Sequence, residues 1–203
     1  MQYVQDYDET YTYRGGNNGT GSTPSWRQVI FPYVKSTQLF KCPSNSQRKP
    51  MADAAGTGNG TFGTSFPQIQ RSYGISGWVA GDTAVNQALN LSDIQSPAGK
   101  ILVSESTNEW TDFGRPGWNN NAGTWDQGFA GHLGQVNFIF CDGHVKSMKP
   151  TATVSTDGPV NMWGATDGGG KAIPVGCTDR SINCDGADAD LLDGMPLWER
   201  KGN

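Results

Sequence analysis

The sequence predicts an α+β fold with short helices, an antiparallel sheet and long loops, and three observations support this. Residues 135–148 alternate polar and apolar side chains on both sides of an Asp-Gly pair, as in a β-hairpin. Residues 101–103 form a continuous apolar run between turn formers, as in a buried strand. Residues 1–11 carry apolar side chains at helical spacing, with acidic residues opposite them.

The hairpin is the clearest local prediction. Residues 136–140 place large apolar side chains at alternate positions, which predicts a strand with one buried face. Asp142 and Gly143 then favour a two-residue type I′ turn, because both tolerate positive φ. Such a turn fixes the register and places Phe140 opposite Val145.

The remaining elements are shorter. The N-terminal helix should end near Tyr7, because acidic residues in a last turn oppose the helix dipole. Residues 26–39 predict two short helical pieces separated at Pro32. Residues 100–105 predict a strand, and residues 44–68 and 108–128 predict long loops.

Composition sets the broad class. The chain has 203 residues, of which 35% are hydrophobic, and 28 are Gly and 11 are Pro. This length predicts a single domain over residues 1–203, with a core over 1–150 and a Gly/Asp-rich C-terminal lobe over 151–203. The net charge of −4, without a basic cluster, argues against a nucleic-acid partner. No apolar run reaches the roughly 18 residues of a membrane span.

The four cysteines predict two disulfides in an oxidising compartment. Cys177 and Cys184 enclose a short loop and are the expected pair, which leaves Cys42 with Cys141. The Cys177–Cys184 disulfide would hold the C-terminal lobe together. Free thiols are the alternative, and zinc is disfavoured because the sequence has no CxxC motif and only two His.

Several segments resemble one bacterial family. His132, nine further residues and then Asp142-Gly143 match the signature of the prepilin-type, processing-associated His-(nine residues)-Asp-Gly family. Three further segments agree with that family in order: residues 1–11 (MQYVQDYDETY), residues 32–35 with 40–44 (PYVK and FKCPS), and residues 96–98 with 102–105 (SPA and LVSE). The resemblance covers about residues 1–149.

The resemblance implies a pilin-like head, in which the end of an N-terminal helix packs on a twisted antiparallel sheet. It implies a non-catalytic structural subunit of a type IV pilus-like or type II secretion filament, with identical or related pilin subunits as partners. Such subunits lie in an extracellular filament or the periplasm, and an N-terminal apolar helix anchors them in the inner membrane before assembly. That helix, with the processing site and methylated N-terminus, is expected upstream of Met1.

His132 and Asp142 also allow a catalytic interpretation, as a general base and the carboxylate that orients it. No nucleophile motif accompanies them, and Asp142 is already explained by the turn. We therefore expect a structural role for His132 and no enzymatic activity. His144, across the turn, is likewise expected to be a strand residue.

Acidic residues gather in the C-terminal lobe, where a flexible Gly-containing loop could supply several oxygen ligands to Ca²⁺. The candidate ligands are Asp179, Asp185, Asp188, Asp190 and Asp193. Their spacing is not that of an EF-hand, but several pseudopilins are similar in holding calcium in a C-terminal loop. The alternative is a solvated acidic loop.

Tryptophans in or beside loops suggest a second function. Exposed Trp rings can stack on sugars, so a surface or pilus-tip adhesin that binds glycan through loop 108–128 is the alternative function. The residues concerned are Trp78, Trp110, Trp118, Trp125, Trp163 and Trp198. The simpler interpretation, which we favour, is that these rings fill the core of a domain with few aliphatic side chains.

Overall fold

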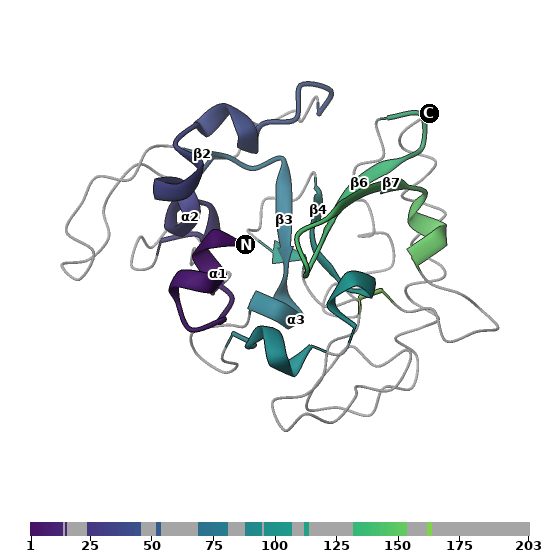
Figure 1. Cartoon of the computed structure of the whole chain (residues 1–203). Coiled ribbons are helices and arrows are strands. Elements are labelled where there is room, and N and C mark those ends of the chain that lie inside the picture. The colour runs from purple at the N-terminus through teal and green to yellow at the C-terminus, as the bar shows by residue number, and fades with distance from the viewer. Residues whose placement is uncertain are drawn as a thin grey trace, which may run out of the picture.

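The largest element of the fold is a sheet with the strand order β5-β3-β4-β6-β7 (Figure 1). In this computed structural model, the described residues are 1–13, 15, 24–45, 52–53, 69–80, 88–94, 96–106, 112–113, 132–153 and 162–163. The strands of this sheet are β3 (Tyr73–Ser76), β4 (Ile101–Glu105), β5 (Asp112–Phe113), β6 (Val136–Phe140) and β7 (Val145–Met148). β3, β4, β6 and β7 pair antiparallel, while β5 pairs parallel with β3. The predicted α+β class is confirmed at this level.

β4 is the central strand and confirms the strand predicted at residues 100–105. Ile101 and Val103 are buried, and so are the polar residues Ser104 and Glu105 at the end of the strand. The pairing of β4 with β6 shifts between Ile101 and Val103, as at a β-bulge. The central strand of the sheet therefore ends in a buried carboxylate.

The hairpin is present, but its predicted register is wrong by one residue. Phe138 pairs with Lys146, and the backbone N–H of Phe140 donates to the carbonyl of His144 at 2.9 Å. The turn therefore has three residues, and only Gly143 among them has positive φ, at 93°. This is the pattern of a type I turn followed by a left-handed residue.

The backbone of Cys141 explains the longer turn. Its N–H donates to the carbonyl of Lys100 at 2.9 Å, and its carbonyl accepts the hydroxyl of Tyr11 at 2.6 Å. Both groups are thus used by neighbouring segments and not by the hairpin ladder. The alternation of β6 is confirmed, since Val136, Phe138 and Phe140 are buried.

Two helices lie to one side of the sheet (Figure 1). α1 (Gln2–Asp6) ends at Tyr7, as predicted. α2 (Trp26–Val34) begins at a capping box between Ser25 and Gln28. The hydroxyl of Tyr33 donates to Asp6 at 2.9 Å and so joins α2 to α1.

Pro32 does not separate two helical pieces, contrary to the prediction. α2 continues through it to Val34 and ends at Lys35, which is left-handed with φ of 56°. A proline in the last turn removes one helical hydrogen bond only, and the helix ends three residues later. The second piece follows as the 3₁₀ helix η1 (Thr37–Phe40).

Shorter elements join these parts. They are β1 (Ala52–Asp53), β2 (Ile69–Gln70), α3 (Gly77–Ala80), η2 (Leu91–Asp93), η3 (Pro97–Gly99) and η5 (Pro150–Thr153). β1 pairs with β2 although it falls in the predicted loop 44–68, and β5 falls in the predicted loop 108–128. Both strands are only two residues long, too short for a periodic signal.

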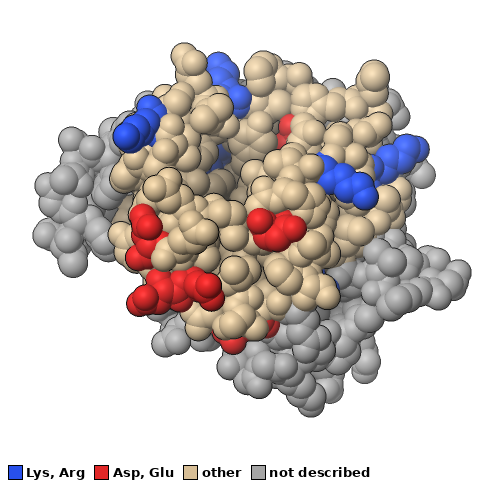
Figure 2. Space-filling model, viewed as in Figure 1, with Lys and Arg blue, Asp and Glu red and all other residues tan. Residues whose placement is uncertain are grey.

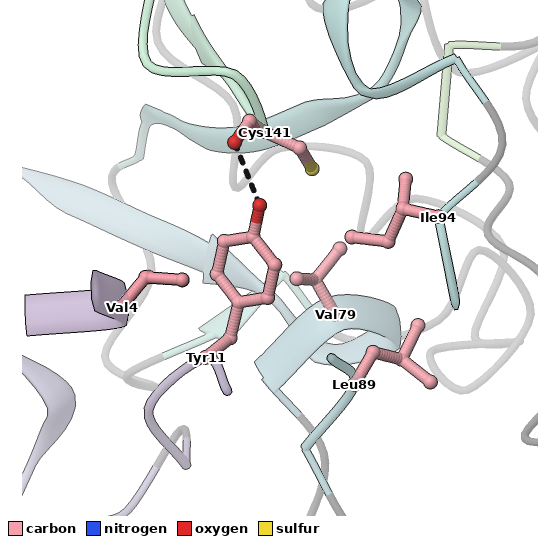
Figure 3. Close-up of a cluster of buried hydrophobic side chains, with 6 residues drawn as sticks. All are labelled: Val4, Tyr11, Val79, Leu89, Ile94 and Cys141. Atoms are coloured by element: carbon pink, nitrogen blue, oxygen red, sulfur yellow. Dashed lines mark hydrogen bonds between the residues drawn. The ribbon is translucent and has the colours of Figure 1, made fainter. Parts of the chain in front are cut away.

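Many of the buried apolar side chains in the described residues belong to one of two clusters. One joins α1 and the hairpin turn, and Figure 3 shows its members around the Tyr11–Cys141 hydrogen bond: Val4, Tyr11, Val79, Leu89, Ile94 and Cys141. The other joins α2 to β3 and β4, and comprises Trp26, Phe40, Ile69, Ile75, Ala80 and Val103. Apolar contacts therefore hold both α1 and α2 to the rest of the fold, and each helix contacts a different set of segments.

The described part of the C-terminal lobe packs on β6. The Trp163 ring meets Phe138 edge-to-face with 6.0 Å between ring centres, and its Nε1–H donates to Thr153 at 2.8 Å. Trp163 is thus a core residue, in line with the simpler interpretation of the tryptophans. In the described parts of the chain, no helix has the length and apolar character needed to cross a bilayer.

Candidate functional site

Three side chains from distant segments meet at the buried end of β4. Glu105 ends β4, Cys42 follows η1, and His132 precedes β6. His132 Nε2 lies 2.8 Å from Glu105 Oε1 and 3.6 Å from Cys42 Sγ. The donor atoms of all three residues lie within 4.8 Å of one another.

Glu105 is 1% exposed, and both of its carboxylate oxygens have hydrogen-bond partners. Oε2 accepts the backbone N–H of Asn137 at 3.0 Å, while Oε1 accepts His132 Nε2–H at 2.8 Å and the Asn137 amide at 3.4 Å. A buried carboxylate needs such partners, because its desolvation is otherwise costly. Glu105 thereby ties β4 to β6 and to His132, which lies four residues before β6.

The Cys42 thiol is held in its neutral form. Burial raises the pKa of Cys42, and the Glu105 carboxylate raises it further, against the lowering effect of a backbone hydrogen bond from Ser44. Burial, with Cys42 and Glu105 nearby, also raises the pKa of Tyr73 to about 12. A reactive cysteine needs the opposite environment, in which a positive charge lowers the pKa of the thiol.

The geometry of the three side chains also differs from that of a nucleophile–base–acid relay. In such a relay, one imidazole nitrogen faces the nucleophile and the other faces the carboxylate. Here the same atom, His132 Nε2, faces both Cys42 and Glu105. The site therefore has converging donor atoms, as at a metal centre or in a structural hydrogen-bond network.

His132 and Asp142, the two ends of the sequence signature, have different partners. Asp142 Oδ1 lies 2.6 Å from His144 Nδ1 and accepts the His144 backbone N–H at 3.1 Å. Both members of this second pair are solvent-accessible, whereas Glu105 is buried. His144 is therefore the turn partner of Asp142, and the candidate acid–base pair of His132 with Asp142 is not formed.

The expected disulfide between Cys42 and Cys141 is also not formed, since both are free, buried thiols. Cys42 lies beside His132 at one end of β4, whereas Cys141 lies in the hairpin turn near Lys100, before the other end of β4. Burial raises the pKa of Cys141 to about 12. The expected pair Cys177–Cys184 lies outside the described residues.

Two other predicted sites fall wholly or mostly outside the described part of the chain. The candidate calcium ligands Asp179, Asp185, Asp188, Asp190 and Asp193 lie outside the described residues. So do Trp110, Trp118, Trp125 and Trp198, and the side chain of Trp78 is not described. On the face shown in Figure 2, acidic side chains gather where α1 lies, and most of the visible basic side chains lie at the upper left, the top and the right.

The sequence did not single out Glu105, although it lies at the centre of the site. The sequence predicts its strand and places it in a segment of the family resemblance, but assigns no role to its charge. The available signal was a carboxylate that continues a fully buried strand, because such a group needs a nearby partner. The sequence favours a disulfide for Cys42 and offers Asp142 as the carboxylate for His132, whereas the structure places both residues beside Glu105.

Comparisons with protein-family models, with curated proteins and with solved structures find no match.

Proposed function

We propose that this chain is a non-catalytic structural subunit of a type IV pilus-like or type II secretion filament, with a pilin-like head. One observation carries the proposal: the four segments that resemble the prepilin-type family contact one another. Cys42, Glu105 and His132 come from three of them and form the site described above. The fourth, residues 1–11, reaches the hairpin turn through Tyr11.

The turn is also close to the start of α1. A Cβ atom added to Gly143 would lie 2.5 Å from Cγ of Met1. Together with the bond from Tyr11 to the Cys141 carbonyl, this contact fixes the N-terminal segment on the hairpin. The two ends of the family signature thus have separate structural roles. His132 contacts Glu105 at the end of β4, and Asp142-Gly143 forms the turn on which the N-terminal segment packs.

This arrangement suits a filament subunit. In such a subunit an apolar helix, N-terminal to the head, anchors the protein in the inner membrane and later packs with its neighbours in the filament core. The head then supplies lateral contacts to identical or related subunits, outside the cell or in the periplasm. In this proposal the signature residues stabilise the head through hydrogen bonds and burial, and they do not take part in a reaction.

Calcium is a further part of this proposal. The five aspartates between positions 179 and 193 would repel one another without a counterion, and Ca²⁺ would order them. We expect EGTA to lower the midpoint of thermal unfolding and added Ca²⁺ to restore it. Equal midpoints with and without EGTA would leave the aspartates as a solvated loop.

Immunogold electron microscopy of producing cells tests the filament assignment. We expect antibodies against this chain to label the shafts of surface filaments at regular intervals. Label at filament tips or on the cell envelope alone would favour the adhesin, and glycan-array binding lost in Trp118→Ala or Trp125→Ala would support it further. Label confined to the cytoplasm would contradict both assignments.

A further inference from the structure

The three donor atoms at the end of β4 have the separations of a metal-ligand set. A zinc ion bonds sulfur at about 2.3 Å and nitrogen at about 2.0–2.1 Å, so tetrahedral angles place the two ligand atoms about 3.6 Å apart. Cys42 Sγ and His132 Nε2 are 3.6 Å apart. The same geometry requires about 3.4 Å between nitrogen and carboxylate oxygen. Here Nε2 and Glu105 Oε1 are hydrogen-bonded at 2.8 Å and would separate by about 0.6 Å to admit the ion.

The donor types select the class of metal. Thiolate and imidazole favour zinc and neighbouring transition ions, whereas Ca²⁺ and Mg²⁺ require sets composed of oxygen. Three protein ligands leave one tetrahedral position for water. The His132 side chain is 34% exposed, which gives an ion a route to the otherwise buried cluster.

The surroundings would support an ion at this position. Asn137 donates its backbone N–H to Glu105 Oε2 at 3.0 Å and its side-chain amide to Oε1 at 3.4 Å, while Oε1 also faces His132. A hydrogen bond of this kind orients a metal-ligating carboxylate. On binding, the Cys42 thiol proton would leave to water, and the imidazole proton would move from Nε2 to Nδ1.

We propose that Cys42, Glu105 and His132 form a binding site for Zn²⁺ or a similar divalent transition ion. The ion would cross-link three segments whose members are up to 90 residues apart in the sequence. It would stabilise the fold of the head without taking part in a reaction. The proposal is independent of the filament assignment, since it concerns only the coordination chemistry of the isolated chain.

Cobalt is the most informative probe, because thiolate-bound Co²⁺ has a charge-transfer absorption in the near ultraviolet and tetrahedral Co²⁺ has visible bands. We expect one equivalent of Co²⁺ to produce both, and Zn²⁺ to displace it. Cys42→Ser should abolish the thiolate band. His132→Gln, a change at a partly exposed side chain that keeps a donor for Glu105, should weaken zinc binding at least tenfold.

Matched controls exist for both substitutions. Cys141→Ser removes the other described buried thiol, and His144→Gln removes the other histidine. Both variants should retain the bands and the affinity of the parent. Absence of the bands in the parent chain, or bands that persist in both Cys42→Ser and His132→Gln, would overturn the proposal. If Cys42→Ser does not fold, His132→Gln alone decides.

Discussion

Two carboxylate–histidine pairs in this chain have similar chemistry and opposite environments. Glu105 and His132 meet at 2.8 Å with the carboxylate buried, and Asp142 and His144 meet at 2.6 Å in an exposed turn. Water competes with an exposed pair and screens it, whereas a buried carboxylate is shielded from water and depends on its protein partners. Burial, and not distance, therefore decides which of the two pairs contributes more to the stability of the fold.

Glu105→Gln should destabilise the chain. The substitution can place an amide N–H against the Asn137 N–H that the carboxylate now accepts, and it weakens the bond with His132. A buried hydrogen bond to a charged group contributes about 1.5–3 kcal/mol, so we expect a loss of that order in the free energy of unfolding by urea. Asp142→Asn is the matched control and should change it far less. Equal effects of the two substitutions would contradict the role assigned to Glu105.

The exposed Asp142–His144 pair should affect how the free energy of unfolding depends on pH. The backbone N–H of His144, and then its side chain, lower the pKa of Asp142. The stability that Asp142 contributes is therefore present above the unfolded pKa of about 3.9 and is lost as pH falls through the lower folded pKa. Urea unfolding of the parent and Asp142→Asn should differ near pH 5, where Asp142 is ionised, and the difference should shrink toward pH 2. A difference that grows in acid would contradict this sign.

At the scale of elements, local sequence predicted the structures whose signals are local. The alternation in β6, the apolar run in β4 and the end of α1 at Tyr7 were all correctly predicted. The turn length was not, because the groups that fix it, Tyr11 and the Lys100 carbonyl, belong to distant segments. The short strands β1 and β5 were not predicted, because a strand of two residues is too short to show an alternating pattern of polar and apolar side chains.

Gly143→Ala tests the revised turn. Gly143 has φ of 93°, a conformation in which an L-residue costs about 1–2 kcal/mol, and the new methyl group would also press on Met1. We expect a loss of about that size in the free energy of unfolding, with a smaller loss for Gly143→Asn because asparagine tolerates positive φ better. A neutral Gly143→Ala would mean that the turn has another geometry.

Phe138→Ala tests the buried face of the hairpin. Phe138 is 0% exposed and packs on Trp163, so we expect a loss of about 3–5 kcal/mol in chemical denaturation. Val145→Ala, on the facing strand but 61% exposed, should change stability by less than about 0.5 kcal/mol. Similar effects at both positions would contradict the assignment of the buried face.

At the scale of the whole molecule, the sequence did not predict which distant residues meet. The cysteine count predicts a Cys42–Cys141 disulfide as the remaining pair, yet each is a free thiol in a different part of the fold. His132 was compared with Asp142 because the signature spaces them, whereas its carboxylate partner, Glu105, comes from another segment. Such contacts depend on sheet order and register, which a single sequence does not specify. The segments of the family resemblance were nonetheless those that meet.

We propose that this chain is a repeating structural subunit of a filament. Cryo-electron microscopy of filaments sheared from producing cells tests it most directly. We predict that each subunit along the shaft shows this head, with the β6–β7 hairpin resting on the N-terminal segment and apolar helices bundled in the core. Filaments built entirely from another chain, with this protein absent or confined to the tip, would contradict the claim.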